Sequence, residues 1–136
     1  MPGPAGPVAP GRRAYYHSAV LRGLKPSTAY LYRVGGAGAW SGWTAFTTAA
    51  DRPAPFTFVY LGDPQDDLTE HVTRVFRAAD QGAPRAAFWL IAGDLTSEPE
   101  DRQTHDLFEA AGPAFQGRPV LPVAGNHDLE FVYENG

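Results

Sequence analysis

The sequence predicts a β-rich segment followed by an α/β domain built on a parallel sheet. Short strand-like stretches separated by turn residues fill residues 14–50, whereas strand and helix patterns alternate in residues 56–136. Three apolar runs in the second part, 56–63, 86–94 and 119–128, each contain a glycine followed at once by an oxygen-bearing side chain. Their even spacing suits a strand, a crossover helix and a returning parallel strand.

The composition describes a globular chain and excludes several classes of function. The 136 residues are 43% hydrophobic and 19% charged, which is typical of a folded domain. A net charge of −4 gives no basic surface, so we expect neither a nucleic-acid partner nor an anionic membrane partner. The absence of cysteine excludes disulfides and thiolate metal sites. No apolar stretch is long enough to span a membrane, and the opening residues lack a signal-peptide pattern.

Four segments follow one another along the chain. Residues 1–13 are rich in proline, glycine and alanine without any periodic pattern, so we expect a flexible tail. Residues 14–50 carry the β signals. Residues 51–55 contain two prolines, which resist both helix and central strand, and form a predicted linker to the α/β part at 56–136.

Three strands are predicted in the β-rich segment. They cover residues 16–21, 30–34 and 43–47, and a cluster of glycines before the third strand marks a tight connection. The stretch from Leu24 to Tyr30 resembles the tyrosine corner of fibronectin type III-like sandwiches, in which a strand-starting tyrosine bonds the backbone upstream. A simple three-stranded meander is the alternative.

Two helices are predicted between the three apolar runs. The apolar positions at helical spacing are Leu68, Val72, Val75, Phe76 and Ala79 in the first helix and Leu107, Phe108 and Ala111 in the second. Residues 97–100, Ser-Glu-Pro-Glu, suit the start of the second helix. The order is therefore β-α-β-α-β.

The oxygen donors after the three glycines are Asp63, Asp94 and Asn126, separated by 31 and 32 residues. A single Gly-Asp turn is weak evidence, since a helix cap or a solvated turn explains it. Three such turns at matched intervals are stronger evidence, because the carboxyl ends of parallel strands meet at one edge of a sheet. Oxygen ligands converging there predict a metal site.

The three motifs together resemble those of the calcineurin-like metallophosphoesterases. The matching residues are Gly62-Asp63, Gly93-Asp94 and the block Gly125-Asn126-His127-Asp128. The fibronectin-like segment ahead of them narrows the resemblance to the purple acid phosphatases and their bacterial relatives. The implied fold is the C-terminal part of a fibronectin III-like β-sandwich followed by the first β-α-β-α-β half of an αββα sandwich.

The resemblance implies two metal ions, Fe, Zn or Mn, and a role for each site residue. Asp94 would bridge the ions, Asp63 would bind the first and Asn126 the second. His127 would face the phosphate, where it stabilises charge or protonates the leaving oxygen. Asp128 is either the partner that fixes the imidazole tautomer or a simple turn carboxylate, and both readings stay open.

The sequence departs from the family pattern in its remaining ligands. Gln65 stands where many members have a histidine ligand, so we expect at most a weak ligand or a water-positioning group. Ser97 stands where the purple enzymes have a metal-bound tyrosine. The family's further histidine ligands belong to the second half of its domain, and His17, His71 and His105 have no partner at ligand spacing.

The expected activity is metal-dependent hydrolysis of phosphoric esters by an acid phosphatase-like phosphomonoesterase. A metal-bound hydroxide would attack a small-molecule phosphate ester, and this chain, as a fragment, would need the remaining half of the domain for activity. Location outside the cytoplasm, secreted or periplasmic, is implied by resemblance only. Alternatives are a phosphodiesterase of the same superfamily or a non-catalytic β module with a degenerate phosphoesterase remnant.

Overall fold

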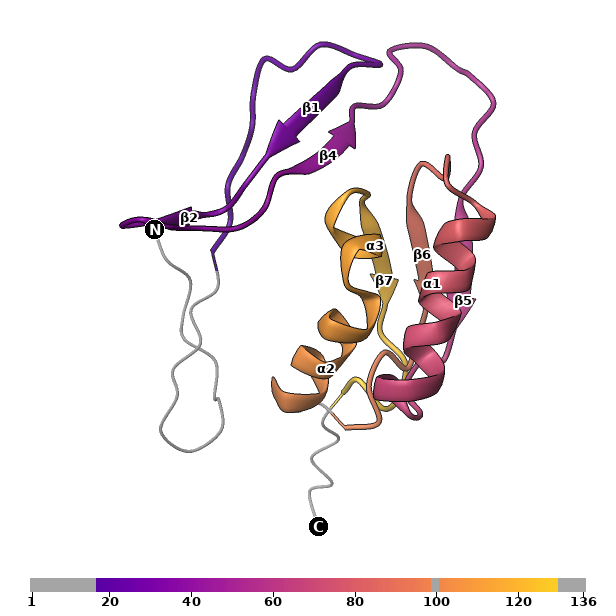
Figure 1. Ribbon diagram of the computed structural model, residues 1–136. Coiled ribbons are helices and arrows are strands. Elements are labelled where there is room, and N and C mark those ends of the chain that lie inside the picture. Colours follow the sequence, from indigo (N-terminus) through magenta and orange to yellow (C-terminus); the bar gives the residue numbers. More distant parts are fainter. Residues whose placement is uncertain (1–16, 99–100, 130–136) are drawn as a thin grey trace, which may run out of the picture.

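The computed structural model describes residues 17–98 and 101–129, which form a β-hairpin and an α/β unit (Figure 1). The predicted tail at 1–13 lies outside the described residues. So do residue 16 of the first predicted strand and Pro99 and Glu100 of the predicted helix start. The β-then-α/β order expected from the sequence is confirmed.

The β-rich segment is one long hairpin. β1 (Ala29–Tyr32) pairs antiparallel with β4 (Thr44–Thr47), and the hairpin closes through β2 (Gly35–Gly36) and β3 (Ala39–Trp40). The predicted strands at 30–34 and 43–47 are therefore confirmed in position. Gly35 is required at the tip, because a Cβ there would lie 2.2 Å from the Ala39 carbonyl oxygen.

The strand predicted at 16–21 is wrong over its described residues, 17–21. These residues are exposed and belong to no strand, and no described strand pairs with them. The alternating pattern satisfies one requirement of a strand, but the backbone also needs a partner. The three-stranded meander is therefore not formed.

Tyr30 makes the backbone contact expected of a tyrosine corner. Its hydroxyl oxygen accepts a hydrogen bond from the Lys25 backbone N–H at 2.9 Å. Its ring stacks on Phe46 with 5.7 Å between ring centroids. The neighbouring Tyr32 reaches the α/β unit, where its hydroxyl donates to the Gln116 carbonyl at 2.7 Å.

The α/β unit contains a three-stranded parallel sheet in the order β5-β6-β7, which confirms the predicted parallel arrangement. The strands are β5 (Val59–Gly62), β6 (Trp89–Ala92) and β7 (Val120–Val123). Gly62 lies opposite Ala92, and Ala92 lies opposite Val123. All three strands thus end flush, and their following loops leave from one edge.

Helices cover one face of this sheet (Figure 1). They are the π-helical turn η1 (Leu68–Val72), α1 (Thr73–Gly82), α2 (Asp101–Ala111) and the short α3 (Pro113–Gln116). α2 packs against η1 and α1. The two predicted helices are confirmed, whereas α3 was not predicted. None of the helices within the described residues is both long and apolar enough to cross a membrane.

The core lies between the helices and β6. Trp89, Phe76 and Ile91 are its largest fully buried side chains, and Phe115 packs edge-on against the first two. Two of the apolar positions at helical spacing, Val75 and Phe108, are exposed and lie outside this core. Each is adjacent in sequence to a buried residue, and successive helical side chains point about 100° apart.

The opposite face of the sheet is uncovered. All three strands were predicted to be buried, yet only β6 is mostly buried, and Tyr60, Leu121 and Val123 on the flanking strands are exposed. Phe58 is also exposed and stacks on Phe88 with 5.1 Å between centroids. The described helices shield one face only, so an apolar surface remains on the other.

η1 begins at Asp67, whose backbone adopts a left-handed conformation with φ 49°. Its carboxylate Oδ1 accepts a hydrogen bond from the Glu70 N–H at 3.3 Å, and Oδ2 bonds to the His71 ring. The hydrogen bond from His71 is the main cause that holds the pKa of Asp67 below its ordinary value of 3.8. The charged carboxylate therefore caps this helix start.

Replacing Phe76 by alanine should destabilise the α/β unit by about 3–5 kcal/mol, because a buried ring leaves a cavity. Phe108→Ala is the matched control. Its ring also contacts Phe115 but is 59% exposed, so we expect a loss of only about 0.5 kcal/mol. Urea unfolding followed by circular dichroism measures both. Equal losses for the two variants would contradict the assignment of the core.

The cap at Asp67 should weaken in acid. Because the folded state lowers this pKa, the stabilisation is fully present above 3.8 and is lost as the pH falls below that value. We expect the protection of the η1 amides, taken as the ratio of the intrinsic to the observed exchange rate, to fall as the pH drops below 3.8. Asp67→Asn keeps an oxygen acceptor and tolerates the left-handed backbone, so its exchange should lack this acid step. An unchanged acid step in the variant would show that another group titrates.

Candidate metal and phosphate site

The predicted site residues lie in the three loops at the carboxyl edge of the sheet. Asp63 directly follows β5, and its N–H donates to the Gly93 carbonyl at 3.2 Å, which continues the β5–β6 pairing by one residue. Gly93 in turn lies against the third loop, since a Cβ there would be 3.2 Å from the Gly125 Cα. The structure therefore brings the three predicted turns into contact through their backbones.

Asp63 and Asp94 both adopt the left-handed backbone region, with φ values of 50° and 47°. This region is uncommon for residues with a side chain and costs about 1–3 kcal/mol. Aspartate tolerates it better than most residues. The same conformation at the same place after two parallel strands directs both carboxylates from equivalent positions.

Asp94 is the central residue of the site. It is buried, and its Oδ1 accepts a hydrogen bond from the His127 backbone N–H at 3.0 Å. Oδ2 has no hydrogen-bond partner among the described residues. Gly125 must be a glycine at this contact, because a Cβ would lie 2.0 Å from Asp94 Oδ1 and 2.4 Å from its backbone nitrogen. The second and third loops are thus packed backbone to side chain.

Asp128 joins these two loops rather than contacting the imidazole. Its Oδ2 accepts from the Gly125 N–H at 2.8 Å, and its Oδ1 accepts from the Thr96 N–H at 3.1 Å. Of the two readings that the sequence leaves open for Asp128, these contacts match the turn carboxylate, since the described hydrogen bonds of its carboxylate do not include the His127 ring. The physical reason is that both oxygens are already engaged by loop N–H and hydroxyl donors.

The imidazole of His127 instead bonds a backbone carbonyl. Its Nδ1 lies 2.9 Å from the Ser97 carbonyl oxygen. A carbonyl only accepts, so Nδ1 must carry the proton, and this assignment follows from the partner. Nε2 is then the ring nitrogen left for a ligand, and the exposed side chain leaves it accessible.

Gln65 lies beside the same loop. Its backbone carbonyl accepts a hydrogen bond from the Ser97 hydroxyl at 3.1 Å. Its side-chain Oε1 is buried without a hydrogen-bond partner in the described structure. A buried, unpaired acceptor is uncommon, and a water or an ion is one way to satisfy it. This orphan oxygen is consistent with a weak ligand or a water-positioning group.

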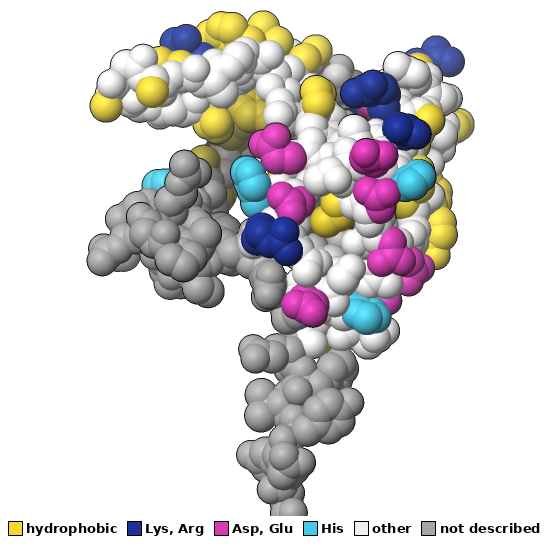
Figure 2. Space-filling view, turned by 60° about the horizontal axis from the view of Figure 1, so that its bottom comes forward, with side chains coloured by type: hydrophobic (Ala, Val, Ile, Leu, Met, Phe, Trp, Pro, Cys, Tyr) yellow, Lys and Arg dark blue, Asp and Glu magenta, His cyan; other side chains and the backbone are white. Residues whose placement is uncertain are grey.

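The assembled donors are few and are all oxygens. Asn126 is exposed in the third loop. It lies between Gly125, whose N–H donates to Asp128, and His127, whose N–H donates to Asp94. Within residues 17–98 and 101–129, no group of three or more His, Cys, Asp or Glu side chains is placed to hold an ion. Acidic and histidine side chains nevertheless gather on the face turned toward the viewer in Figure 2.

Sequence reasoning missed Thr96 and undervalued Ser97. Thr96 is buried and donates to Asp128 from both its N–H and, at 3.5 Å, its hydroxyl. Ser97 appeared only as a missing tyrosine, yet its carbonyl holds the imidazole. A polar residue two positions after a buried Gly-Asp turn is a weak signal that could have indicated the loop contact.

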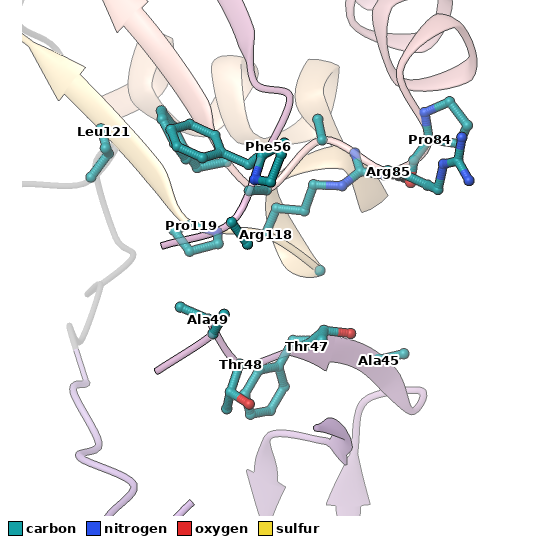
Figure 3. A pocket seen from close by; sticks show the side chains of 18 of the residues that line it. Ala45, Thr47, Thr48, Ala49, Phe56, Pro84, Arg85, Arg118, Pro119 and Leu121 are labelled. Atoms are coloured by element: carbon teal, nitrogen blue, oxygen red, sulfur yellow. Dashed lines mark hydrogen bonds between the residues drawn. The ribbon is translucent and has the colours of Figure 1, made fainter. Parts of the chain in front are cut away.

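A groove lies at the other end of the sheet. Its volume is about 940 Å³, and it runs between the hairpin, the linker and the amino ends of the strands, where Phe56, Arg118 and Pro119 face Thr47 and Thr48 (Figure 3). None of the predicted site residues lines it. The groove is therefore distinct from the site formed by the three loops.

Residues 56–136 match the calcineurin-like phosphoesterase family. This chain belongs to that family. The preceding residues, 6–48, match the N-terminal domain of purple acid phosphatase, so the order of the two matches is that of the β-rich segment and the α/β unit. The Gly-Asp and Gly-Asn-His-Asp residues described above all fall inside the phosphoesterase match.

Two known proteins show the same relationship. The chain is 29% identical over 129 residues to human acid phosphatase type 7, covering 91% of this chain and 29% of that protein. Its fold is similar to that of a purple acid phosphatase from yellow lupin seeds, with a TM-score of 0.73 and 20% identity over 96% of this chain. The chain thus spans 29% of the length of each of these two relatives.

Gly125→Ala should force the second and third phosphoesterase loops apart, because the added methyl group meets Asp94 at 2.0 Å. We expect a stability loss of about 1–3 kcal/mol together with faster amide exchange at His127. Gly42→Ala is the control, since a Cβ at Gly42 meets nothing within 4 Å. If both variants unfold at the same urea concentration, the close packing of Gly125 on Asp94 is not formed in solution.

Proposed function

We propose that this chain supplies the first half of a dinuclear metal centre that hydrolyses phosphate monoesters, as in acid phosphatases. One observation carries the proposal. One carboxylate oxygen of Asp94 accepts a hydrogen bond from the His127 backbone N–H, and the other has no partner among the described residues. Asp94 lies at the edge of the sheet from which Asp63 also emerges. Family membership and the fold likeness support the reaction class.

The proposed ligands are Asp63 for the first ion, Asn126 for the second and Asp94 as the bridge. The open oxygen of Asp94 and the buried orphan oxygen of Gln65 fit such a role, because both acceptors lack a partner in the described structure. Since every donor is an oxygen, hard cations such as Mn²⁺ suit this half better than Zn²⁺, and Fe remains an alternative. Bound ions would neutralise phosphate charge and activate water.

His127 is proposed to act on the phosphate through Nε2. Its Nδ1 is held by the Ser97 carbonyl, so Nε2 is the ring nitrogen available to a phosphate or leaving-group oxygen. When the ring is protonated, Nε2–H donates to that oxygen and can pass its proton to the departing alkoxide. Asp128 supports this geometry indirectly by fixing the loop that carries His127.

We also propose that the centre is completed by ligands beyond the described residues. The chain spans 29% of each relative's length, and the described part lacks a full ligand set. The uncovered apolar face of the sheet supports a second sheet packing there, as in an αββα sandwich. The hairpin with its tyrosine-corner contact supports a partial fibronectin type III-like domain ahead of it.

Asp94→Asn should weaken Mn²⁺ binding at least roughly tenfold, because it removes one full negative charge from the bridge position. The amide oxygen can still accept from the His127 N–H, so the loops should stay folded. Electron paramagnetic resonance titration of the chain with Mn²⁺ measures the change. Asp51→Asn, at an exposed carboxylate in the linker, should bind as the wild type does.

Equal Mn²⁺ affinity in wild type and Asp94→Asn would overturn the bridging role. A companion assay compares an aryl phosphate monoester with the corresponding diester in the presence of Mn²⁺, Zn²⁺ or Fe³⁺. Faster hydrolysis of the diester would replace the proposed monoesterase by a phosphodiesterase. Full hydrolysis by the chain alone, unaffected by Asp94→Asn, would contradict the proposed half-site.

A further inference from the structure

We infer that Gln103 is a positioning residue that fixes the tautomer and orientation of the His127 imidazole through the Ser97 carbonyl. Gln103 lies on α2 and does not contact the imidazole itself. The structural part of this inference stands on the hydrogen bonds of the loop after Asp94. Its kinetic part rests on the proposed phosphatase function.

The first link joins α2 to the loop. Gln103 Oε1 accepts from the Ser97 N–H at 2.8 Å and from the Glu98 N–H at 3.1 Å. Because both partners are donors, the contacting atom of the amide must be its oxygen. Gln103 is the third residue of α2, a position from which glutamine and glutamate side chains commonly reach back to N–H groups ahead of a helix.

The second link follows from the planarity of the peptide bond. The Glu98 N–H and the Ser97 C=O belong to the same peptide group, and in a trans peptide these two groups point in opposite directions. Drawing the Glu98 N–H toward Gln103 therefore turns the Ser97 carbonyl away from α2. On that other side it meets His127 Nδ1 at 2.9 Å.

The third link sets the chemistry of the ring. With a carbonyl acceptor at Nδ1, the proton stays on Nδ1 and Nε2 is left free. Ser97 is also held by its hydroxyl, which donates a hydrogen bond to the Gln65 carbonyl. Among the described contacts, however, Gln103 is the only acceptor for the Glu98 N–H. The carbonyl orientation thus depends on this side chain.

The test uses three variants of the full chain. Gln103→Leu removes the acceptor at similar volume, and Gln103→Glu keeps an oxygen at the same reach. Gln81→Leu makes the same chemical change at an exposed position on α1 and serves as the control. Long-range ¹H–¹⁵N correlation spectra, recorded at high pH where imidazoles are neutral, report which ring nitrogen of His127 carries the proton.

Wild type, Gln103→Glu and Gln81→Leu should show His127 protonated at Nδ1. Gln103→Leu should show a mixture of both tautomers, with faster exchange of the Ser97 and Glu98 amides. An unchanged tautomer in Gln103→Leu, despite that faster exchange, would overturn the inference. If Gln103→Leu does not fold, Gln103→Asn replaces it, because the shorter asparagine side chain cannot reach both N–H groups. A mixture of His127 tautomers in that variant would then support the inference, and an unchanged tautomer would overturn it.

In the metal-loaded protein, once the remaining ligands of the proposed centre are supplied, kcat for a phosphate monoester should fall about tenfold in Gln103→Leu while KM stays unchanged, and Gln103→Glu should restore it. A merely structural role would lower the folded fraction without changing the tautomer. The two proposals fail separately. A shifted tautomer in Gln103→Leu together with equal Mn²⁺ affinity in wild type and Asp94→Asn would remove the proposed function and leave the positioning role, whereas weaker Mn²⁺ binding in Asp94→Asn with no tautomer change in Gln103→Leu would do the reverse.

Discussion

The flush register of the three parallel strands is the constraint on which the site depends. Gly62, Ala92 and Val123 lie side by side across the sheet, so the three following loops leave together. A slip of one residue in either pairing would turn each strand's side chains to the other face and move its loop along the sheet edge. Close contact between the loops, with Gly125 against Asp94, is possible only in this register.

The loop network divides stabilising and reactive tasks among neighbouring residues. Asp128 has both carboxylate oxygens engaged by loop donors, so it contributes to structure. Asp94 has one oxygen bonded to the His127 N–H and one without a partner among the described residues, so it can both stabilise the loop and bind a ligand. Asp63 and Asp94 also adopt an unfavourable backbone conformation, which stability alone would not favour. Asp67 has the same backbone conformation with both carboxylate oxygens bonded, so the conformation alone does not mark a reactive residue.

The sequence predicted the meeting of the three loops better than it predicted burial. Gly93 and Gly125 mark close backbone approach, which is a local requirement that a single chain reveals, whereas a Cβ at Gly62 would make only an ordinary contact at 3.8 Å. Burial is a tertiary property. The apolar residues of β5 and β7 looked buried, but which face the helices cover is decided by packing. Phe108 next to buried Leu107 shows the same limit for a helix, since both fit the periodic pattern.

The contacts of Asp128 and His127 could not be predicted for a different reason. Adjacent residues in the Gly-Asn-His-Asp block invite a direct pairing, but the pairing depends on how the loop after β6 approaches. That approach involves Thr96, Ser97 and Gln103, which carry no motif of their own. Hydrogen-bond partners across loops are set by geometry on the ångström scale, and residue type alone leaves several choices.

The bond between the Tyr32 hydroxyl and the Gln116 carbonyl ties the hairpin to the turn just ahead of β7. β7 is only four residues long, and its far end leads into the loop of Asn126 and His127. The two ends of one short edge strand are therefore held by different parts of the molecule. The strand that leads to the imidazole is therefore connected, through α3 and a single hydrogen bond, to the hairpin at the opposite end of the sheet.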